Sequence, residues 1–345
     1  MTPIRINLAL QGGGAHGAYT WGVLDRLLDE EDVEIAAISG TSAGALNGAA
    51  FKAGMAAGGR DGARAALDTL WSRMGALTDM RLPAWMIGNL ALTGQFAQAL
   101  EYSFPYALAD AFTRIASPYA YGPFWQNPLA GVVADFDYEK VCGEGGPDLF
   151  ICATNVRSGK IRVFAGDAIS TQVILASACL PTLFRAVEIE DPLTGHMEAY
   201  WDGGYTGNPA LFPLFDPKLP DDLLIVNINP LERDEVPKSP QAIQNRINEI
   251  SFNSSLLREL RAIEFVQRLI ANGNVTEGAM KEVKVHMVSD DPIMTELSVA
   301  TKMIPNPYLL NALKTAGRTA METFLSENKS ALGKRSTVDL PAMFN

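Results

Sequence analysis

The sequence is short of charge, above all of positive charge, and of metal-binding side chains. Its 345 residues include 28 Lys and Arg against 39 Asp and Glu, a net charge of −11, with three His and three Cys. An acidic chain lacks the broad basic surface that holds a phosphate backbone, so nucleic acid is excluded as the main partner. The three cysteines have no paired spacing, which argues against a disulfide framework and a zinc site.

The sequence also shows neither the pattern of a signal peptide nor a clear membrane-spanning run. No basic segment precedes a long apolar stretch at the N-terminus, so we predict no signal peptide and expect the cytoplasm as the compartment. Residues 82–100 are uncharged and nearly long enough to cross a bilayer, but Pro83 and several Gly, Asn and Gln residues interrupt them.

Much of the missing charge is local to residues 83–134, which we call the apolar insert. This stretch carries three charged residues, Glu101, Asp110 and Arg114, and ten of the 29 aromatic residues of the chain. Aromatics with so little charge either fill the core of a subdomain or form an apolar surface. The sequence leaves both open.

Strands and helices alternate in the first 60 residues. Residues 6–10 and 33–38 are predicted as buried strands, and between them Val23, Leu24 and Leu27 fall on one face of a helix. A strand–helix–strand unit of this length predicts a parallel sheet. We therefore expect a three-layer α/β/α fold with a mainly parallel central sheet.

The rest of the chain continues this pattern. Residues 5–230 are expected to form the main domain, including the apolar insert, and residues 231–345 a mainly helical C-terminal extension packed on it. The helical segment after Pro240 either packs on the sheet or forms the face of a homodimer. Further strands are predicted at 149–155, 160–164, 198–201, 222–229 and 283–288, and further helices at 45–59, 170–179, 243–269 and 308–325.

The strongest single motif is Gly40-Thr41-Ser42-Ala43-Gly44, directly after the second predicted strand. Its small residues permit a sharp strand-to-helix turn that exposes the Ser42 hydroxyl at the N-terminus of a helix. The free N–H groups of that terminus favour a nearby negative charge. The motif therefore predicts a nucleophilic serine, with a plain tight turn as the alternative.

A second glycine cluster, residues 12–17, follows the first predicted strand. Its G-x-G-x-x-G spacing fits a dinucleotide site, but such a site needs an acidic residue where the second strand ends, and Ser42 follows that end. The other use is an oxyanion hole formed by backbone N–H groups of Gly12, Gly13, Gly14 and Ala15. Parallel strands bring both glycine turns to one edge of the sheet, which favours this second use.

The serine needs a base, and the chain offers three histidines and one well-placed aspartate. His16 lies inside the glycine cluster and is expected to pack there, and His196 is expected at the surface of a hairpin. His286 alone suits a Ser-acid-His triad, although too few strands precede Ser42 for that arrangement. Asp202 ends a predicted strand before two glycines and could take the serine proton directly if apolar surroundings raise its pKa.

These three motifs, in this order, resemble the signatures of patatin-like phospholipases. Residues 178–184, Ala-Cys-Leu-Pro-Thr-Leu-Phe, are similar to the Pro-and-Phe segment that precedes the family's aspartate, and Asn208-Pro209 matches the Asn-Pro that often follows it. The resemblance extends over residues 5–230. One departure is that the family commonly has Arg or Lys where His16 stands, and a largely neutral His weakens any support that a cation gives to the loop.

The resemblance implies hydrolysis of acyl esters in lipids by a Ser-Asp dyad, with Ser42 as nucleophile, Asp202 as base and the glycine loop as oxyanion hole. It implies neither a metal nor an organic cofactor. The remaining motif residues hold supporting positions: His16, Gly17, Gly40, Gly44, Gly203 and Gly204.

On this hypothesis the protein is a phospholipase A, lysophospholipase or carboxylesterase, and its partner is a lipid or acyl-ester substrate. The apolar insert then serves as a lid, an acyl-chain channel or a peripheral contact with a membrane or lipid droplet. Two other functions stay open: a lipid-binding or scaffold protein with a vestigial site, and an acyltransferase that uses an acceptor other than water.

Overall fold

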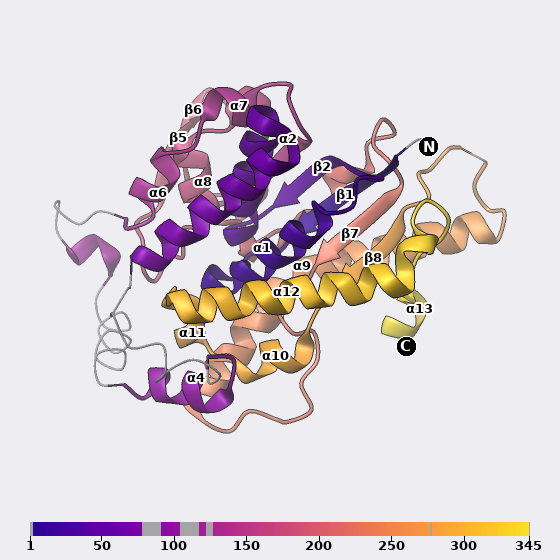
Figure 1. The fold of residues 1–345 in the computed structure, drawn as a ribbon. Coiled ribbons are helices and arrows are strands. Elements are labelled where there is room, and N and C mark those ends of the chain that lie inside the picture. Colours follow the sequence, from indigo (N-terminus) through magenta and orange to yellow (C-terminus); the bar gives the residue numbers. More distant parts are fainter. Residues whose placement is uncertain (1–2, 78–90, 104–116, 122–126, 277, 345) are drawn as a thin grey trace.

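An eight-stranded sheet forms the centre of the protein (Figure 1). The computed structural model describes residues 3–77, 91–103, 117–121, 127–276 and 278–344. The strand order is β5-β6-β3-β2-β1-β7-β8, and β4 pairs with β3. The strands are β1 (Ile4–Leu10), β2 (Val33–Gly40), β3 (Asp148–Asn155), β4 (Ile161–Ala165), β5 (Val187–Asp191), β6 (His196–Asp202), β7 (Asp222–Val226) and β8 (Lys284–Val288).

The centre of the sheet is parallel and one end is antiparallel. β1 pairs in parallel with β2 and β7, as do β2 with β3 and β7 with β8. β4, β5 and β6 form antiparallel pairs at the other end, which includes the hairpin predicted at His196. All parallel strands end at the same edge, which is where Ser42 and the glycine cluster follow their strands.

Helices cover both faces of the sheet, which confirms the predicted three-layer α/β/α fold (Figure 1). The helices are α1 (Gly17–Leu27), α2 (Ala43–Ala76), α4 (Gly94–Glu101), α6 (Ala130–Ala134), α7 (Tyr138–Cys142), α8 (Thr171–Ser177), α9 (Pro240–Ala271), α10 (Asp291–Glu296), α11 (Val299–Met303), α12 (Pro307–Asn328) and α13 (Leu340–Met343). Short 3₁₀ turns relevant to the site are η1 (Gly14–His16), η3 (Pro118–Tyr121), η5 (Gly203–Tyr205) and η6 (Phe212–Phe215).

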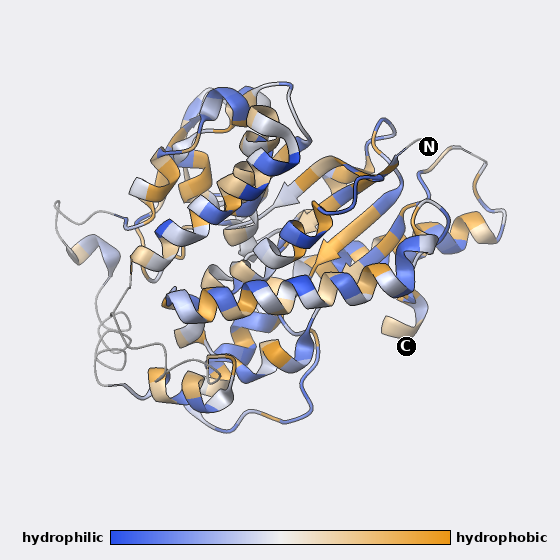
Figure 2. Cartoon of the chain, viewed as in Figure 1, coloured by the Kyte–Doolittle hydropathy of each residue, from blue (hydrophilic) through white to orange (hydrophobic). Residues whose placement is uncertain are grey.

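Alternate residues of the central strands enter two separate apolar layers. Leu8 and Leu10 of β1 pack with α1, α2 and α12, whereas Ala9 packs with α9 through Leu256 and Leu260. Figure 2 shows the hydrophobic colour on the central strand β7 and alternating colours along α12. Because the central strands are buried on both faces, their sequences are nearly continuous apolar runs.

The helix after β2 is longer than the sequence predicts. The predicted span ended at residue 59, whereas α2 runs to Ala76 across a kink. Gly58 (φ −160°) and Gly59 (φ 61°) leave helical geometry at that kink, and Leu67 and Trp71 beyond it are buried. The prediction stopped at the glycines because they are poor helix formers, but the burial of a second apolar face stabilises the continuation.

The C-terminal residues complete the same sheet and the same layer of helices. β8 extends the sheet beside β7, and α12 packs along α1. The two helices approach backbone to backbone, because a Cβ on Gly22 would lie 1.9 Å from Lys314 O and one on Gly317 would lie 2.0 Å from Tyr19 O. Residues beyond 280 are therefore integral to the layer that covers β1.

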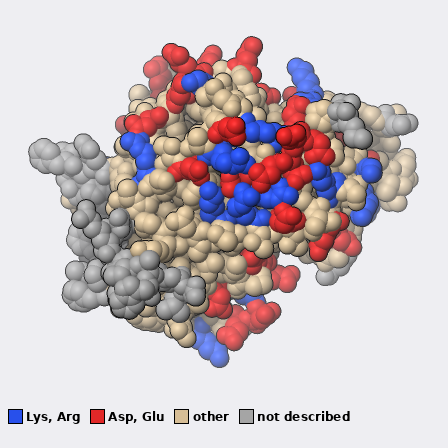
Figure 3. All heavy atoms as spheres, in the orientation of Figure 1, with Lys and Arg blue, Asp and Glu red and all other residues tan. Residues whose placement is uncertain are grey.

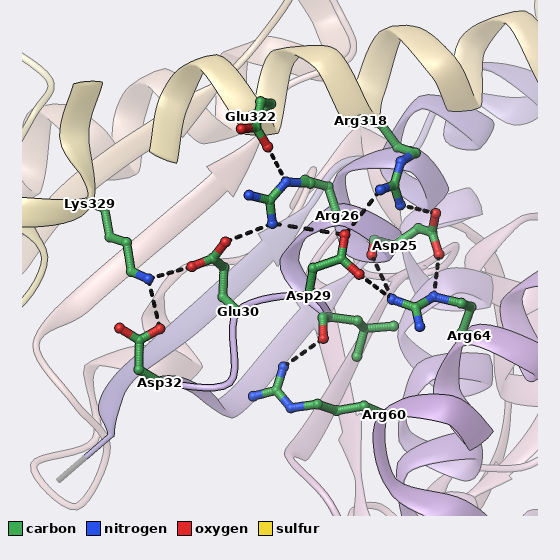
Figure 4. Close-up of polar contacts among 11 residues, drawn as sticks. Asp25, Arg26, Asp29, Glu30, Asp32, Arg60, Arg64, Arg318, Glu322 and Lys329 are labelled. Atoms are coloured by element: carbon green, nitrogen blue, oxygen red, sulfur yellow. Dashed lines mark hydrogen bonds and ion pairs between the residues drawn. The ribbon is translucent and has the colours of Figure 1, made fainter. Parts of the chain in front are cut away.

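Ion pairs join α1 to α2 and α12 on the face shown in Figure 3, where Lys and Arg alternate with Asp and Glu. Figure 4 shows the arrangement. Buried Asp25 accepts from Arg64 at 2.9 Å and pairs with Arg318, and Asp29 accepts from Arg318 at 3.0 Å. Nearby, Lys329 pairs with Glu30 and with Asp32. The network fixes α12 on α1 through opposite charges that are partly shielded from water.

The described parts of the apolar insert are helical pieces, α4, η3 and α6. Most of its aromatic residues, and residues 82–90 of the uncharged run at 82–100, lie outside the described residues. None of the helices that the structure describes is long and apolar enough to span a bilayer.

Candidate active site

Ser42 occupies a sharp turn between β2 and α2. Its backbone adopts φ 54° and ψ −119°, a positive φ that no other non-glycine residue in the described ranges shows. Such a conformation costs about 1–3 kcal/mol and persists only where neighbours impose it. Here the Ser42 N–H donates to Ser177 Oγ at 2.9 Å, and the Gly44 N–H donates to Thr41 O at 2.8 Å. The hydroxyl is thereby held at the N-terminus of α2.

Small residues around this turn are required by close packing. A Cβ on Gly44 would lie 2.1 Å from Leu10 O, and one on Gly40 would lie 2.6 Å from Gly44 O. A Cβ on Gly12 would lie 2.7 Å from the Cβ of Ser42. Because real Cβ contacts are longer than this, only glycine lets the serine turn and the glycine cluster lie against each other.

Asp202 ends β6 and is buried on the same side of the sheet. Its N–H donates to Cys179 O at 2.8 Å, and its Oδ1 accepts the N–H of Gly204 at 2.7 Å. The Ser42 side chain interacts with this carboxyl group and lowers its pKa against the effect of burial. The structure therefore brings Ser42 and Asp202, 160 positions apart in the sequence, next to each other.

Burial dominates the electrostatics of this carboxyl group. Removal from water raises the pKa of Asp202 from its ordinary value of 3.8 to about 7, although hydrogen bonds from Gly204 and Ser42 oppose the rise. Burial, together with the nearby Asp202, also raises the pKa of the Cys179 thiol to about 12. A carboxyl with a pKa near 7 can accept and return a proton at neutral pH.

The glycine loop, residues 12–17, lies on the other side of Ser42. Asn208 holds it: its Oδ1 accepts the Gly12 N–H at 2.7 Å, and its Nδ2 donates to Gly12 O at 3.4 Å. The Gly12 N–H is thus already engaged. Within the described ranges, the backbone N–H groups of Gly13, Gly14 and Ala15 form no hydrogen bond.

The remaining motif glycines let the neighbouring elements pack closely around the site. A Cβ on Gly17 would lie 2.5 Å from the Cβ of Ala43, and one on Gly203 would lie 2.3 Å from Cys152 O. Gly204 lies against Phe252 of α9. These residues allow the close approach of η1, α2, β3 and α9 around the serine and the aspartate.

His16 packs in the interior, as expected from its position in the loop. It is buried, its Nε2 lies 2.8 Å from Thr301 Oγ1, and no partner is described for Nδ1. Burial, and then the charge of Lys302, lowers the pKa of His16 well below its usual value. The imidazole is therefore neutral at neutral pH.

The other histidines lie away from Ser42. His286, on β8, has Nε2 2.9 Å from Asp222 Oδ1 and Nδ1 3.1 Å from Thr337 Oγ1. Asp222 begins β7, at the edge of the sheet opposite Ser42, so the triad alternative is wrong. His196 is exposed at the start of β6, as expected.

Several supporting residues escaped sequence reasoning because they lie far from the motifs. Ser177 binds the Ser42 N–H, and Asn229 donates through Nδ2 to Gly12 O at 2.9 Å. Asn253 accepts a hydrogen bond from Gln11 at 3.1 Å. The one available signal was the polar Asn229 directly after an apolar strand, at the edge where parallel strands end.

No metal site accompanies these residues. In the described part of the chain, no group of three or more His, Cys, Asp or Glu side chains is arranged to hold a metal ion. Two surface grooves of about 520 and 1050 Å³ lie between α9 and α13 and include neither Ser42 nor Asp202.

The fold and the site define an α/β protein in which a serine on a strand-to-helix turn lies between a buried carboxyl group and a glycine loop. The family model described as patatin-like phospholipase matches residues 8–215, and the chain belongs to this family. The resemblance found in the sequence is thereby confirmed. The matched segment contains Ser42, Asp202 and the glycine loop, whereas β7, α9, β8 and α12 follow it.

Two solved structures with some likeness are distant in sequence. VipD from Legionella pneumophila is 14% identical with a TM-score of 0.42, over 94% of this chain and 67% of VipD. A chain of the heterodimeric ExoU-SpcU complex from the type III secretion system of Pseudomonas aeruginosa is 18% identical with a TM-score of 0.29, over 99% of this chain and 65% of that chain. Such TM-scores carry no argument about this protein. A search of the curated proteins gives no match.

Proposed function

We propose that the chain is a lipid acyl hydrolase of the phospholipase A, lysophospholipase or carboxylesterase type. It cleaves fatty-acyl esters through Ser42, Asp202 and a covalent acyl-enzyme. One observation carries the proposal: the Ser42 side chain lies next to a buried Asp202 carboxyl group, interacts with it, and the pKa of that carboxyl is about 7. Membership of the patatin-like phospholipase family supports a lipid ester as the substrate.

In the first step Ser42 Oγ attacks the ester carbonyl while its proton moves to the Asp202 carboxylate. The carbonyl oxygen becomes an oxyanion, which the N–H groups of Gly13, Gly14 and Ala15 stabilise because no other acceptor occupies them. The C–O bond to the leaving alcohol then breaks. Asp202 returns the proton to that alcohol, and the acyl group remains on Ser42.

In the second step water attacks the acyl-enzyme carbonyl, and Asp202 takes a proton from the water. Collapse of the second oxyanion releases the fatty acid and returns the proton from Asp202 to Ser42 Oγ. The same two side chains therefore serve both half-reactions, and no metal or organic cofactor enters the proposal.

Hydrolysis of p-nitrophenyl esters of several chain lengths, followed by a lipid panel, tests the proposal. Ser42→Ala and Asp202→Asn should each lose at least about 1000-fold in kcat, since each removes a reacting group. The kcat/KM of the wild type should rise with pH through about 7 as Asp202 ionises. Ser177→Thr, which keeps the hydroxyl that binds the Ser42 N–H, is the matched control.

Unchanged hydrolysis by Ser42→Ala would reject the nucleophile, and full activity of Asp202→Asn would reject the dyad. Absence of labelling of Ser42 by a fluorophosphonate would favour a binding or scaffold protein with a vestigial site. New acyl products in the presence of added alcohols or lysolipids would favour acyl transfer over hydrolysis.

We extend the proposal to the apolar insert as the part that contacts lipid. Tyr102 and Tyr119 expose 67% and 63% of their surface. The Tyr119 hydroxyl accepts the Ala186 N–H at 3.2 Å. Ala186 ends the segment 179–186, and at the other end of that segment the Cys179 carbonyl accepts the Asp202 N–H. The described part of the insert therefore contacts a segment that leads to the site, which suits a lid or channel and a peripheral contact with lipid.

A further inference from the structure

Lys302 lies directly behind the glycine loop although it is 285 positions or more beyond it in the sequence. It belongs to α11, which packs against η1. A Cβ on Gly14 would lie 2.3 Å from Lys302 O and 3.6 Å from the Lys302 Cβ. The backbone of Lys302 therefore touches the loop at the residue whose φ of +59° only glycine adopts easily.

The ammonium group of Lys302 reaches the loop through one intervening side chain. Nζ donates to Asn229 Oδ1 at 2.9 Å. Asn229 Nδ2 in turn donates to Gly12 O at 2.9 Å and to Gln11 Oε1 at 3.1 Å. Gln11 Oε1 also accepts the backbone N–H groups of Ile228 and Asn229. The cation and the loop backbone are thus two ends of one buried hydrogen-bonded chain.

Lys302 holds the Asn229 amide by its oxygen, while Gly12 O and Gln11 Oε1 hold it by its nitrogen. An ammonium group only donates, so it must face the amide oxygen, in agreement with the direction that the two acceptors require. If Lys302 is removed or loses its charge, the buried amide oxygen loses its cationic donor. The Asn229 side chain is then held from one side only, and the loop that it supports can shift.

We propose that Lys302 is a positioning residue for the glycine loop: through Asn229 it fixes the direction of the Gly12 peptide group and so the N–H groups of Gly13 and Gly14. Its positive charge lies behind the loop, two hydrogen bonds away from the Gly12 carbonyl. This proposal rests on the proposed function, because it concerns the same acyl-transfer site.

Three charged or titratable groups face Lys302. Glu249 of α9 favours its charged form, whereas burial and the nearby Arg233 disfavour it, and burial is the largest effect. Together they lower the pKa of Lys302 to about 8. The third group, His16 on η1, is neutral at neutral pH and adds no charge. Lys302 is therefore protonated at pH 7 and loses its charge as the pH rises through about 8.

Kinetics of Lys302→Met and Lys302→Arg test the proposal, with Lys314→Met as the matched control. Lys314 is another half-buried lysine, bound to Asp68 on the α1–α12 side. Lys302→Met should lower kcat about 10- to 100-fold with KM changed less than about threefold, since a charge and an oriented loop act on the oxyanion. Lys302→Arg should recover most of kcat. Lys314→Met should stay within about twofold of the wild type.

The pH profile separates positioning from a merely structural anchor. The wild type should lose kcat/KM above about pH 8, whereas Lys302→Arg should keep it for at least about one more pH unit, because arginine stays charged. A Lys302→Met variant within twofold of the wild-type kcat, or identical alkaline limbs for the wild type and Lys302→Arg, would overturn the proposal. The comparison of the alkaline limbs of the wild type and Lys302→Arg tests the proposal even if Lys302→Met fails to fold.

Amide NMR of the glycine loop tests the role of Lys302 without measuring catalysis. The Gly12, Gly13 and Gly14 resonances of the wild type should titrate with a midpoint near pH 8, and those of Lys302→Arg should not titrate there. Resonances that do not respond to pH would reject the role of Lys302 whether or not the protein hydrolyses esters. Retained activity in Ser42→Ala, in contrast, would reject the proposed function and leave the loop titration valid.

Discussion

Asp202 combines two properties that oppose each other. Its burial makes the ionised carboxylate costly to the folded chain, and the same burial raises its pKa to about 7, where a carboxyl group is an effective base. An aspartate exposed to water would favour stability and would be too weak a base to take a serine proton at neutral pH. In the proposed function, Asp202 therefore gives up stability in exchange for reactivity.

Replacing this carboxyl should stabilise the protein in a pH-dependent way. A pKa raised on folding means that the folded state binds the proton more tightly, so stability falls as pH rises from about 4 to 7 and stays low above. Asp202→Asn removes this cost while its Oδ1 still accepts the Gly204 N–H. Its free energy of unfolding should exceed that of the wild type by up to about 4 kcal/mol at pH 8 and by little at pH 4.

Thermal or denaturant unfolding at both pH values measures the difference. Asp61→Asn, at a side chain that is 97% exposed, is the control and should change stability by less than about 0.5 kcal/mol at either pH. A gain for Asp202→Asn that is equal at pH 4 and pH 8 would contradict the raised pKa.

At the scale of elements, α9 and α12 support the site from opposite faces of the sheet. α9 contributes Ser255, which accepts the Asn208 N–H at 3.1 Å, and Glu259, which accepts the N–H groups of Leu211 and Phe212. α12 follows α11 and holds it near the loop through its packing on α1. Neither helix carries a proposed reacting group, yet both determine where the loops lie.

The crossing of α1 and α12 should not tolerate a side chain at Gly317. A methyl group there would lie 2.0 Å from Tyr19 O, so the helices must separate. Gly317→Ala should destabilise the protein by about 1–3 kcal/mol, which lowers Tm by several degrees. Gly131→Ala on α6, where a Cβ meets nothing within 4 Å, is the control and should be neutral or slightly stabilising. Equal Tm values for both variants would contradict the close crossing.

At the scale of the whole molecule, local patterns predicted local structure. Apolar runs and glycine turns predicted the central strands, the turn at Ser42 and the parallel sheet, because each depends on residues close in sequence. The contacts of the glycine loop with Asn229 and Lys302, and of the preceding Gln11 with Asn253, could not be predicted, because they join positions more than 200 residues apart. The length of α2 was missed for a related reason, since its second half is stabilised by distant apolar partners.

The proposed lipid contact of the apolar insert also belongs to this largest scale. Tyr102→Ser should lower activity on phospholipid vesicles about fivefold, because the loss of one exposed ring weakens binding by about 1 kcal/mol. Activity on a soluble ester should change less than about twofold. Leu193→Ser, at a 76% exposed leucine in the β5–β6 turn, is the control. Equal losses on both substrates for Tyr102→Ser would instead indicate that the ring supports a subdomain core.

The position of Asn208, which binds the N–H and the carbonyl of Gly12, also affects its rate of deamidation. Asparagine side chains deamidate when the nitrogen of the following peptide bond attacks the side-chain amide, a reaction that starts from a backbone N–H. Asn208 is followed by Pro209, which has no N–H, and it is fully buried. The amide that holds Gly12 from both sides is thereby shielded from the reaction that would turn it into a carboxylate and set a negative charge against the oxyanion site.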